Sequence, residues 1–222
     1  ETDIPVPDAK NSVWKLNAET IGVYRVAYSP EHLAKLGKAA AQKDSAFSLE
    51  DRVGLVSDAF TLAQAGYSKT SGGLALMHAL RGDNSSLVNT AAALNLGKLA
   101  SVWWEQPQSV RDGINRFRAD VFGPMARELT FEFGANDSSE LRELRETVIT
   151  AAASAGDTWT LDEIRRRFAP LQEHGDYSLI HPDLLRTVLS QAVKHGGEAE
   201  YETVMGVYRA PPTPAHKTSA MV

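Results

Sequence analysis

The stretch Ser48–Tyr67, SLEDRVGLVSDAFTLAQAGY, decides the fold that we predict for this chain. Placed at about 100° per residue, it spreads apolar side chains over most of the helix circumference and leaves only a narrow polar strip. Ser48 is expected to cap this helix, with Asp51 at capping-box spacing, and Gly66 can adopt the left-handed conformation that ends it. A helix of this kind is typically buried among other helices.

Two charged residues of this stretch have mainly apolar neighbours. Arg52 points into the apolar arc, and Asp58 lies between Leu55 and Leu62. Because burying an unpaired charge is costly, we expect each to have a partner. Arg52 and Asp58 are therefore predicted to form structural ion pairs that fix the packing of the helix; contact with a ligand is the alternative.

The residues before this helix have a different pattern. VWKLN (13–17) and GVYRVAYS (22–29) are β-prone runs separated by a short turn-like segment. They predict a β-hairpin that follows an extended lead-in, so that residues 1–28 form the lead-in and hairpin. The exposed edge of such a hairpin predicts dimerisation by strand pairing.

From Ser29 onward the apolar period is about 3.6 residues, which predicts about nine or ten helices joined by short loops. A break is expected at Gly123-Pro124, because proline removes a helical hydrogen bond, and Thr160 is expected to open a later helix. The fold class predicted is mainly α, with antiparallel helix pairs stacked as a HEAT/armadillo-like superhelix over residues 29–222. This region is expected to stop within a helix, as part of a longer protein.

Composition excludes several classes of function. The 23 Lys+Arg are dispersed among 28 Asp+Glu, with a net charge of −5, which argues against nucleic-acid binding. No apolar run approaches the roughly 20 residues that cross a bilayer, so no membrane partner is expected. The absence of Cys excludes disulfides and Cys-ligated zinc. It fits a cytoplasmic location and leaves an extracellular one open.

A search for catalytic motifs assigns no catalytic, cofactor-binding or metal-binding residue. None of the six histidines begins an H-E-x-x-H motif, and no G-x-S-x-G elbow is present. His174 and His181, with Asp176 and Asp183 nearby, have a spacing that permits metal binding. A loop with a helix cap is the simpler interpretation of these residues.

Three stretches together resemble a known family. GVYRVAYS (22–29), DRVGLVSDAFTLAQAGY (51–67) and IHPDLLRTVLSQAVKHGGEAEYETVMGVYR (180–209) are similar to the C-terminal region of zinc aminopeptidases of the aminopeptidase N family, which includes the puromycin-sensitive and endoplasmic-reticulum aminopeptidases. The resemblance implies that the hairpin ends a β-sandwich domain and that zinc belongs to the parent enzyme. It also implies three partners: the parent's catalytic domain, its β-sandwich domain and a peptide substrate.

The resemblance further implies that the inner surface of the helical domain lines the peptide cavity. Arg165 and Arg166 are then candidates to meet a peptide carboxylate. Taken alone, the run Arg165–Arg167 is typical of a solvent-exposed helix face. Trp103 and Trp104 are expected in the core, and an exposed pair would instead be an interface anchor.

The function predicted is that of a non-catalytic C-terminal domain of a zinc aminopeptidase. It would enclose the peptide cavity and contribute to substrate length selection and domain closure. A free-standing helical-repeat module that binds a partner protein is the alternative. An unrelated helical enzyme is a third hypothesis, and it would need convergent polar groups that the sequence does not reveal.

Overall fold

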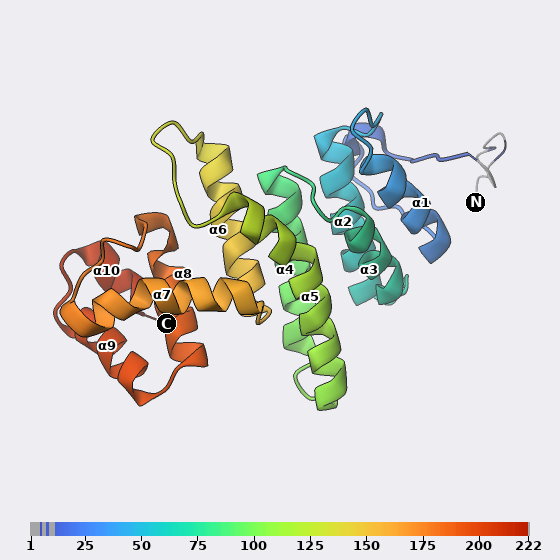
Figure 1. The fold of residues 1–222 in the computed structure, drawn as a ribbon. Coiled ribbons are helices and arrows are strands. Elements are labelled where there is room, and N and C mark those ends of the chain that lie inside the picture. The colour runs from blue at the N-terminus through green and yellow to red at the C-terminus, as the bar shows by residue number, and fades with distance from the viewer. Residues whose placement is uncertain (1–4, 6–7, 9–11, 222) are drawn as a thin grey trace. The chain divides into compact units, whose positions relative to one another are not determined.

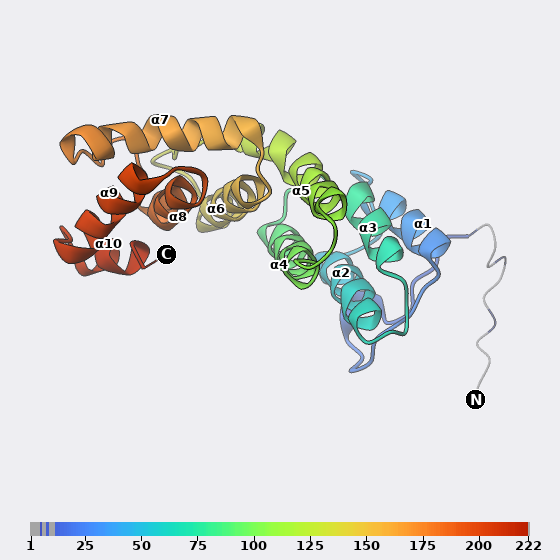
Figure 2. The same cartoon turned by 90° about the horizontal axis from the view of Figure 1, so that it is seen from below.

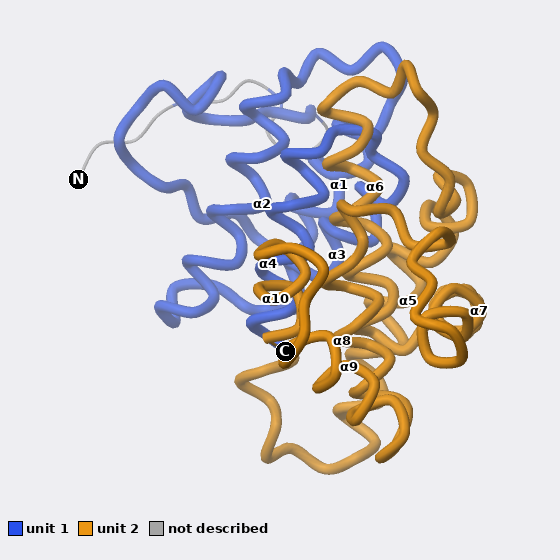
Figure 3. The backbone as a smooth tube through the Cα atoms, turned by 90° about the vertical axis from the view of Figure 1, so that its left-hand side faces the viewer, with its two compact units in different colours: residues 1–99 blue, residues 100–222 orange. Residues whose placement is uncertain are grey.

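The computed structural model describes residues 5, 8 and 12–221. The chain divides into two compact units, Glu1–Leu99 and Ala100–Val222, which Figure 3 shows in separate colours. In the first unit the elements are η1 (Ala18–Thr20), α1 (Pro30–Ala40), α2 (Leu49–Gln64), α3 (Thr70–Ala79) and α4 (Ser86–Val102), the last of which crosses the boundary. The second contains α5 (Gln108–Leu129), α6 (Ser139–Ser154), α7 (Thr158–His174), η2 (Pro182–Leu184), α8 (Leu185–His195), α9 (Glu198–Arg209) and α10 (Pro214–Ser219).

The first unit is built around α3, which packs against both α1 and α2 (Figure 1). Its core contains Leu36, Val56 and Leu76, one from each helix, all fully buried. Burial of side chains of this size stabilises a fold by about 1.5–3 kcal/mol each. The predicted capping box is confirmed: the Asp51 backbone N–H donates to Ser48 Oγ at 3.1 Å, and the Ser48 N–H donates to Asp51 Oδ2 at 3.2 Å.

The predicted N-terminal β-hairpin is wrong for the residues that the structure describes, because none of them forms a strand. Backbone groups that a strand ladder would use are bound by side chains instead. The Leu16 N–H donates to the Tyr28 hydroxyl at 2.9 Å, and the Asn17 amide bonds both the N–H and the C=O of Gly22. The described N-terminal residues therefore offer no strand edge through which the predicted dimer could pair.

In the second unit helices pack in successive pairs. α5 packs on α6, and α7 packs on α6 and α8; α8 and α9 are in contact, as are α9 and α10. Figure 2 shows α7 along one side of this unit, with α6 and α8 beside it. The mainly helical class and the packing of helices in pairs are therefore confirmed.

Two local predictions for the second unit are wrong. Helix α5 passes through Pro124 without a break, because its length and buried face hold the helix on both sides of the proline. Helix α7 begins at Thr158 rather than after Thr160, because Asp157 caps it: Asp157 Oδ1 accepts from the Thr160 N–H at 3.0 Å.

Candidate functional site

The two charged residues on α2 lie in the first unit and have defined neighbours. Arg52 Nε lies 3.1 Å from Asp83 Oδ2. Asp58 Oδ1 lies 2.8 Å from Arg25 Nη1, and Asp58 Oδ2 accepts from the Val26 N–H at 3.0 Å. The carboxylate of Asp58 thus holds the segment that precedes α1 against the flank of α2.

A third charge on α2, Asp51, makes the more buried contact. Its Oδ1 lies 2.7 Å from Lys15 Nζ and accepts from the Glu19 N–H at 2.7 Å, and both partners of the ion pair have less than a tenth of their side chain exposed. Burial raises the pKa of Asp51, but the bonds from Lys15, Glu19 and Ser48 outweigh it and leave the pKa below its ordinary value. Asp51 therefore has two roles, as a helix cap and as an anchor for the N-terminal segment.

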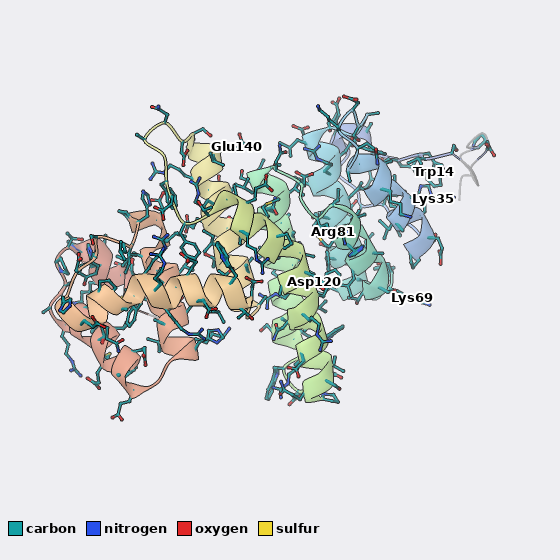
Figure 4. The ribbon with its side chains drawn as sticks, viewed as in Figure 1. Trp14, Lys35, Lys69, Arg81, Asp120 and Glu140 are labelled. Carbon is teal, nitrogen blue, oxygen red and sulfur yellow. The ribbon has the colours of Figure 1, made fainter. Side chains whose placement is uncertain are left out.

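An aromatic cluster closes the N-terminal segment onto α1. The Trp14 ring lies 4.4 Å from the His32 ring and 5.8 Å from the Tyr28 ring, and His32 Nε2 bonds the Trp14 carbonyl at 2.8 Å. Beside these rings is an open pocket of about 330 Å³, which Trp14 and Lys35 help to line. Figure 4 labels both of these side chains. Because the rings contact one another, the main role of the cluster is structural: it attaches the N-terminal segment to α1.

The basic run on α7 divides into exposed and buried residues. Arg165 pairs with Asp162 at 2.5 Å and Arg166 with Glu163 at 2.8 Å, and both arginines have more than half of their side chain exposed. The prediction of a solvated face is wrong for Arg167, which is buried. It donates to the Leu179 carbonyl at 2.9 Å, and its guanidinium lies 4.9 Å from the centre of the Phe131 ring.

The second unit contains a pocket of about 360 Å³ between α7, α8 and the start of α9. Apolar side chains from α7 and α8 line its floor, and polar side chains surround them. The floor includes Leu161, Ile164, Phe168, Ala169 and Ala192, and the polar lining Arg165, Gln172, Gln191, His195 and Glu200. An apolar floor with a few convergent polar groups is the usual character of a small-ligand site.

The lining of this pocket carries charges of both signs, Arg165 on α7 and Glu200 on α9. Burial lowers the pKa of His195, and the charges of Lys194 and Arg165 lower it further. The pKa of Lys194 is lowered in turn by burial and by the charge of Arg118. Glu200 is the acidic group in the lining, and its Oε2 accepts from the Gly197 N–H at 2.7 Å at the first turn of α9.

The tryptophan pair lies in the turn after α4. Trp104 is 65% exposed and Trp103 is half-buried, so the prediction that both lie in the core is wrong for Trp104. Val102, just before the pair, is 71% exposed. The helix ends at Val102, so these side chains stand at a turn, where few neighbours can cover them.

Metal chemistry finds no support in the described part of the chain. No group of three or more His, Asp or Glu side chains there could hold a metal ion. His174 is exposed. His181 stacks on Phe133, with ring centres 3.6 Å apart, and its Nδ1 accepts from the Asp183 N–H. The described residues of this chain therefore do not form a zinc site. The zinc that the aminopeptidase resemblance implies belongs to the parent enzyme.

Comparison with known proteins identifies the family. The sequence profile described as the ERAP1-like C-terminal domain matches residues 14–222. The chain belongs to this domain family. The resemblance predicted from the sequence is thereby confirmed. Within residues 5, 8 and 12–221, no helix of this domain is long and apolar enough to cross a membrane.

Curated relatives of the domain are aminopeptidases. Aminopeptidase 2 of Candida albicans is 30% identical over 208 residues, which cover 94% of this chain and 22% of that protein. The alanine/arginine aminopeptidase of Saccharomyces cerevisiae is 30% identical over 94% of this chain and 24% of its own length. Aminopeptidase M1-A of Oryza sativa is 27% identical over 90% of this chain and 23% of its own length. The chain thus spans about a quarter of the length of these relatives.

Sequence reasoning missed most of the polar residues that meet in this domain. It selected Arg165, but not Gln191, His195 or Glu200, which lie 26–35 residues further along the chain and reach the same pocket. The one signal in the sequence was the pair Gly196-Gly197, which ends α8 and allows α9 to fold back beside it. The contact between Lys15 and Asp51 had no comparable signal.

Proposed function

We propose that this chain is the non-catalytic C-terminal domain of a zinc aminopeptidase. The match to the ERAP1-like C-terminal domain over residues 14–222 carries the proposal, together with aminopeptidase relatives about four times as long. In this proposal residues 29–222 form the helical domain, with helix pairs stacked in the HEAT-like manner, and residues 1–28 join it to the preceding domain. Its partners are the catalytic and β-sandwich domains of the same protein, and a peptide.

The proposed role of the domain is to enclose the peptide cavity, to contribute to length selection and to complete domain closure. Arg165 and Arg166 are the candidates for peptide contact. Their present partners lie one helical turn away, Asp162 exposed and Glu163 partly buried, and ion pairs near the surface contribute only about 0–1 kcal/mol. A peptide carboxylate can therefore replace them at small cost, with the bidentate geometry that arginine favours.

The test uses the parent enzyme and peptides of increasing length. Changing Arg165 and Arg166 together to Gln is expected to lower kcat/KM for long peptides several-fold and to leave single-residue chromogenic substrates unaffected. Arg209→Gln is the matched control, because Arg209 is also exposed and weakly paired, with Glu202 at 3.8 Å. An equal loss for short and long substrates would contradict a role in length selection.

A second experiment addresses the claim that the domain is non-catalytic. The pure 222-residue chain is expected to show no aminopeptidase turnover with added zinc, and measurable turnover would contradict the proposal. Immunoblotting of the source organism is expected to show a product about four times the 24.1 kDa of this chain. A product near 24.1 kDa would favour the free-standing interaction module, for which exposed Trp104 is the candidate anchor.

The proposal assigns the parent enzyme to the cytoplasm. Cell fractionation with the same antibody tests this assignment. One relative, Aminopeptidase 2 of Saccharomyces cerevisiae, is described as mitochondrial, so recovery in the mitochondrial fraction is the outcome that would overturn it.

A further inference from the structure

Two sites in this chain place a hydroxyl residue directly before a proline, Ser29-Pro30 and Thr213-Pro214. In each, the hydroxyl caps a helix and accepts from the backbone N–H of a histidine three residues later, His32 at 3.2 Å and His216 at 3.4 Å. An enzyme can select such a site with an apolar pocket for the proline, because the N–H of any other residue would be left unpaired there. Proline-directed protein kinases recognise this pattern, and only the surroundings in the fold distinguish the two sites.

The segment around Thr213 is exposed and already extended. It connects α9 to α10 and has the sequence RAPPTPAHK over residues 209–217. Thr213 has φ of −144° and ψ of 163°, and residues 212–215 are exposed. Three of the four residues 211–214 are prolines, which lack a backbone N–H and favour an extended chain. Protein kinases bind their substrates in extended conformation, so this segment can enter a kinase cleft with little rearrangement.

Few contacts hold the Thr213 hydroxyl. Its Oγ1 lies 2.8 Å from His216 Nδ1, and the bond that it accepts from the His216 N–H is long, at 3.4 Å. Helix α10, which Thr213 caps, has six residues, and a helix of that length is marginal by itself. Freeing the hydroxyl therefore requires opening only the first turn of a short helix at the surface.

Ser29 is exposed too, but the chain beside it is fixed. Tyr28 is 8% exposed, its hydroxyl accepts from the Leu16 N–H at 2.9 Å, and its ring lies 5.8 Å from the Trp14 ring. Ser29 itself caps α1, whose 11 residues pack on α3. Presenting Ser29 to an enzyme would pull the Tyr28 side chain out of its buried position. The fold therefore protects Ser29 and leaves Thr213 available.

The surroundings of Thr213 can accommodate the charge of a phosphate, which is about −1.5 to −2 at neutral pH. Arg209 and Lys217, both exposed, lie four residues to either side of it. Arg209 has a weak partner, Glu202 at 3.8 Å, and Lys217 Nζ lies 5.2 Å from the centre of the Tyr208 ring. Residues 203–222 contain no Asp or Glu, so the nearest charges along the chain attract a phosphate.

We propose that Thr213 is a phosphorylation site for a proline-directed serine/threonine protein kinase. The Oγ1 of Thr213 attacks the terminal phosphorus of a nucleoside triphosphate; an O–P bond forms, and the bond from that phosphorus to the leaving nucleoside diphosphate breaks. The hydroxyl proton passes to a base of the kinase. Pro214, and Pro211 two positions before the threonine, are the residues that the kinase recognises. The inference does not rest on the proposed function, because it requires only the exposed segment of this chain.

The test is phosphorylation of the 222-residue chain by a purified mitogen-activated protein kinase with ATP, followed by mass spectrometry of the digested protein. Synthetic peptides of residues 24–34 and 208–218 give the reference rates, because they present both sites without the fold. The rate at Thr213 is expected within about threefold of that in its peptide, and the rate at Ser29 at least about tenfold below that in its peptide. Equal ratios at the two sites, or no phosphate on Thr213 of the folded chain, would overturn the proposal.

Variants identify the modified residue and the recognised proline. Thr213→Val removes the hydroxyl and is expected to abolish phosphorylation of the segment between α9 and α10. Pro214→Ala keeps the hydroxyl and is expected to lower the rate at least about tenfold, because the new N–H has no partner in a pocket that selects proline. Thr218→Val is the matched control, since Thr218 lies in the same helix without a following proline, and it should leave the rate unchanged. Phosphate on Thr218, or an unchanged rate in Pro214→Ala, would refute the assignment.

The natural protein gives an independent readout. Mass spectrometry of the protein isolated from its source is expected to find phosphate on Thr213 that phosphatase treatment removes. Its absence from Thr213 in growing and in stressed cells would show that no kinase of the organism uses the site, and would overturn the proposal.

Discussion

Replacing Asp51 by Asn tests how the first unit holds its N-terminal segment. Asp51 uses Oδ1 for Lys15 and for the Glu19 N–H, and Oδ2 for the Ser48 N–H. Asparagine keeps the shape but has one acceptor oxygen, so one of the two backbone N–H groups loses its bond, at about 1 kcal/mol. The ammonium of Lys15 also loses its counter-charge.

The full penalty for breaking a buried ion pair is about 3–5 kcal/mol. In this protein it is smaller, because Lys15 Nζ still donates to the Asn17 carbonyl at 2.6 Å and to the Leu16 carbonyl at 3.3 Å. We therefore expect Asp51→Asn to lower the free energy of unfolding by about 2–3 kcal/mol in total. Urea unfolding followed by circular dichroism measures the loss, and hydrogen exchange over 49–64 assigns it to α2.

The stability difference between wild type and Asp51→Asn should also depend on pH in a definite direction. The pKa of Asp51 is lowered in the folded protein, so its contribution is fully present above the unfolded value, near 3.9, and is lost as pH falls through the folded value. The difference between wild type and Asp51→Asn should therefore be constant from pH 7 to about pH 5 and should shrink below about pH 4.

Glu50→Gln is the matched control, since it removes the same charge from an exposed position in the same helical turn. It is expected to cost less than about 0.5 kcal/mol. If Asp51→Asn and Glu50→Gln were equally stable at pH 7, the reasoning about the buried anchor would be refuted.

Three further changes test other contacts by urea unfolding. Asp58→Ala removes the acceptor for the Val26 N–H and should lower the free energy of unfolding by about 1–2 kcal/mol. A loss below about 0.5 kcal/mol would show that this carboxylate does not stabilise the N-terminal segment. Arg167→Gln should cost about 2–4 kcal/mol and Arg166→Gln less than about 1 kcal/mol, and the reverse order would contradict the burial of Arg167. Pro124→Ala should stabilise the protein by about 1–3 kcal/mol, since it restores a hydrogen bond inside α5; no gain would mean that the helix already accommodates the proline.

Helix α2 shows how much of the fold was predictable. Its capping box and the left-handed Gly66, with φ of 80°, involve residues at most a few positions apart, and the structure has both. The helix ends at Gln64 rather than Tyr67, because the chain turns at Gly66. Local rules predict such features because the groups that satisfy them are neighbours in sequence.

The N-terminal segment shows where local rules fail. Residues 13–29 have the composition of two strands, but a hairpin without a sheet beside it is marginal. Carboxylates of α2 bind two of its N–H groups, those of Glu19 and Val26, and this outcome depends on a helix about 30 residues away. Periodicity carries no information about such a contact.

The sequence by itself determined the helical class, most helix boundaries and the family, since these depend on periodicity, capping residues and motifs that are read along the chain. Only the tertiary structure decided which charges are buried and which meet. Three consecutive arginines have different environments, because Arg167 turns toward Phe131 while Arg165 and Arg166 turn toward solvent. The pocket of the second unit forms because Gly196-Gly197 lets α9 return beside α8 and bring Glu200 opposite α7. Such juxtapositions depend on distances through space, which the order of residues does not specify.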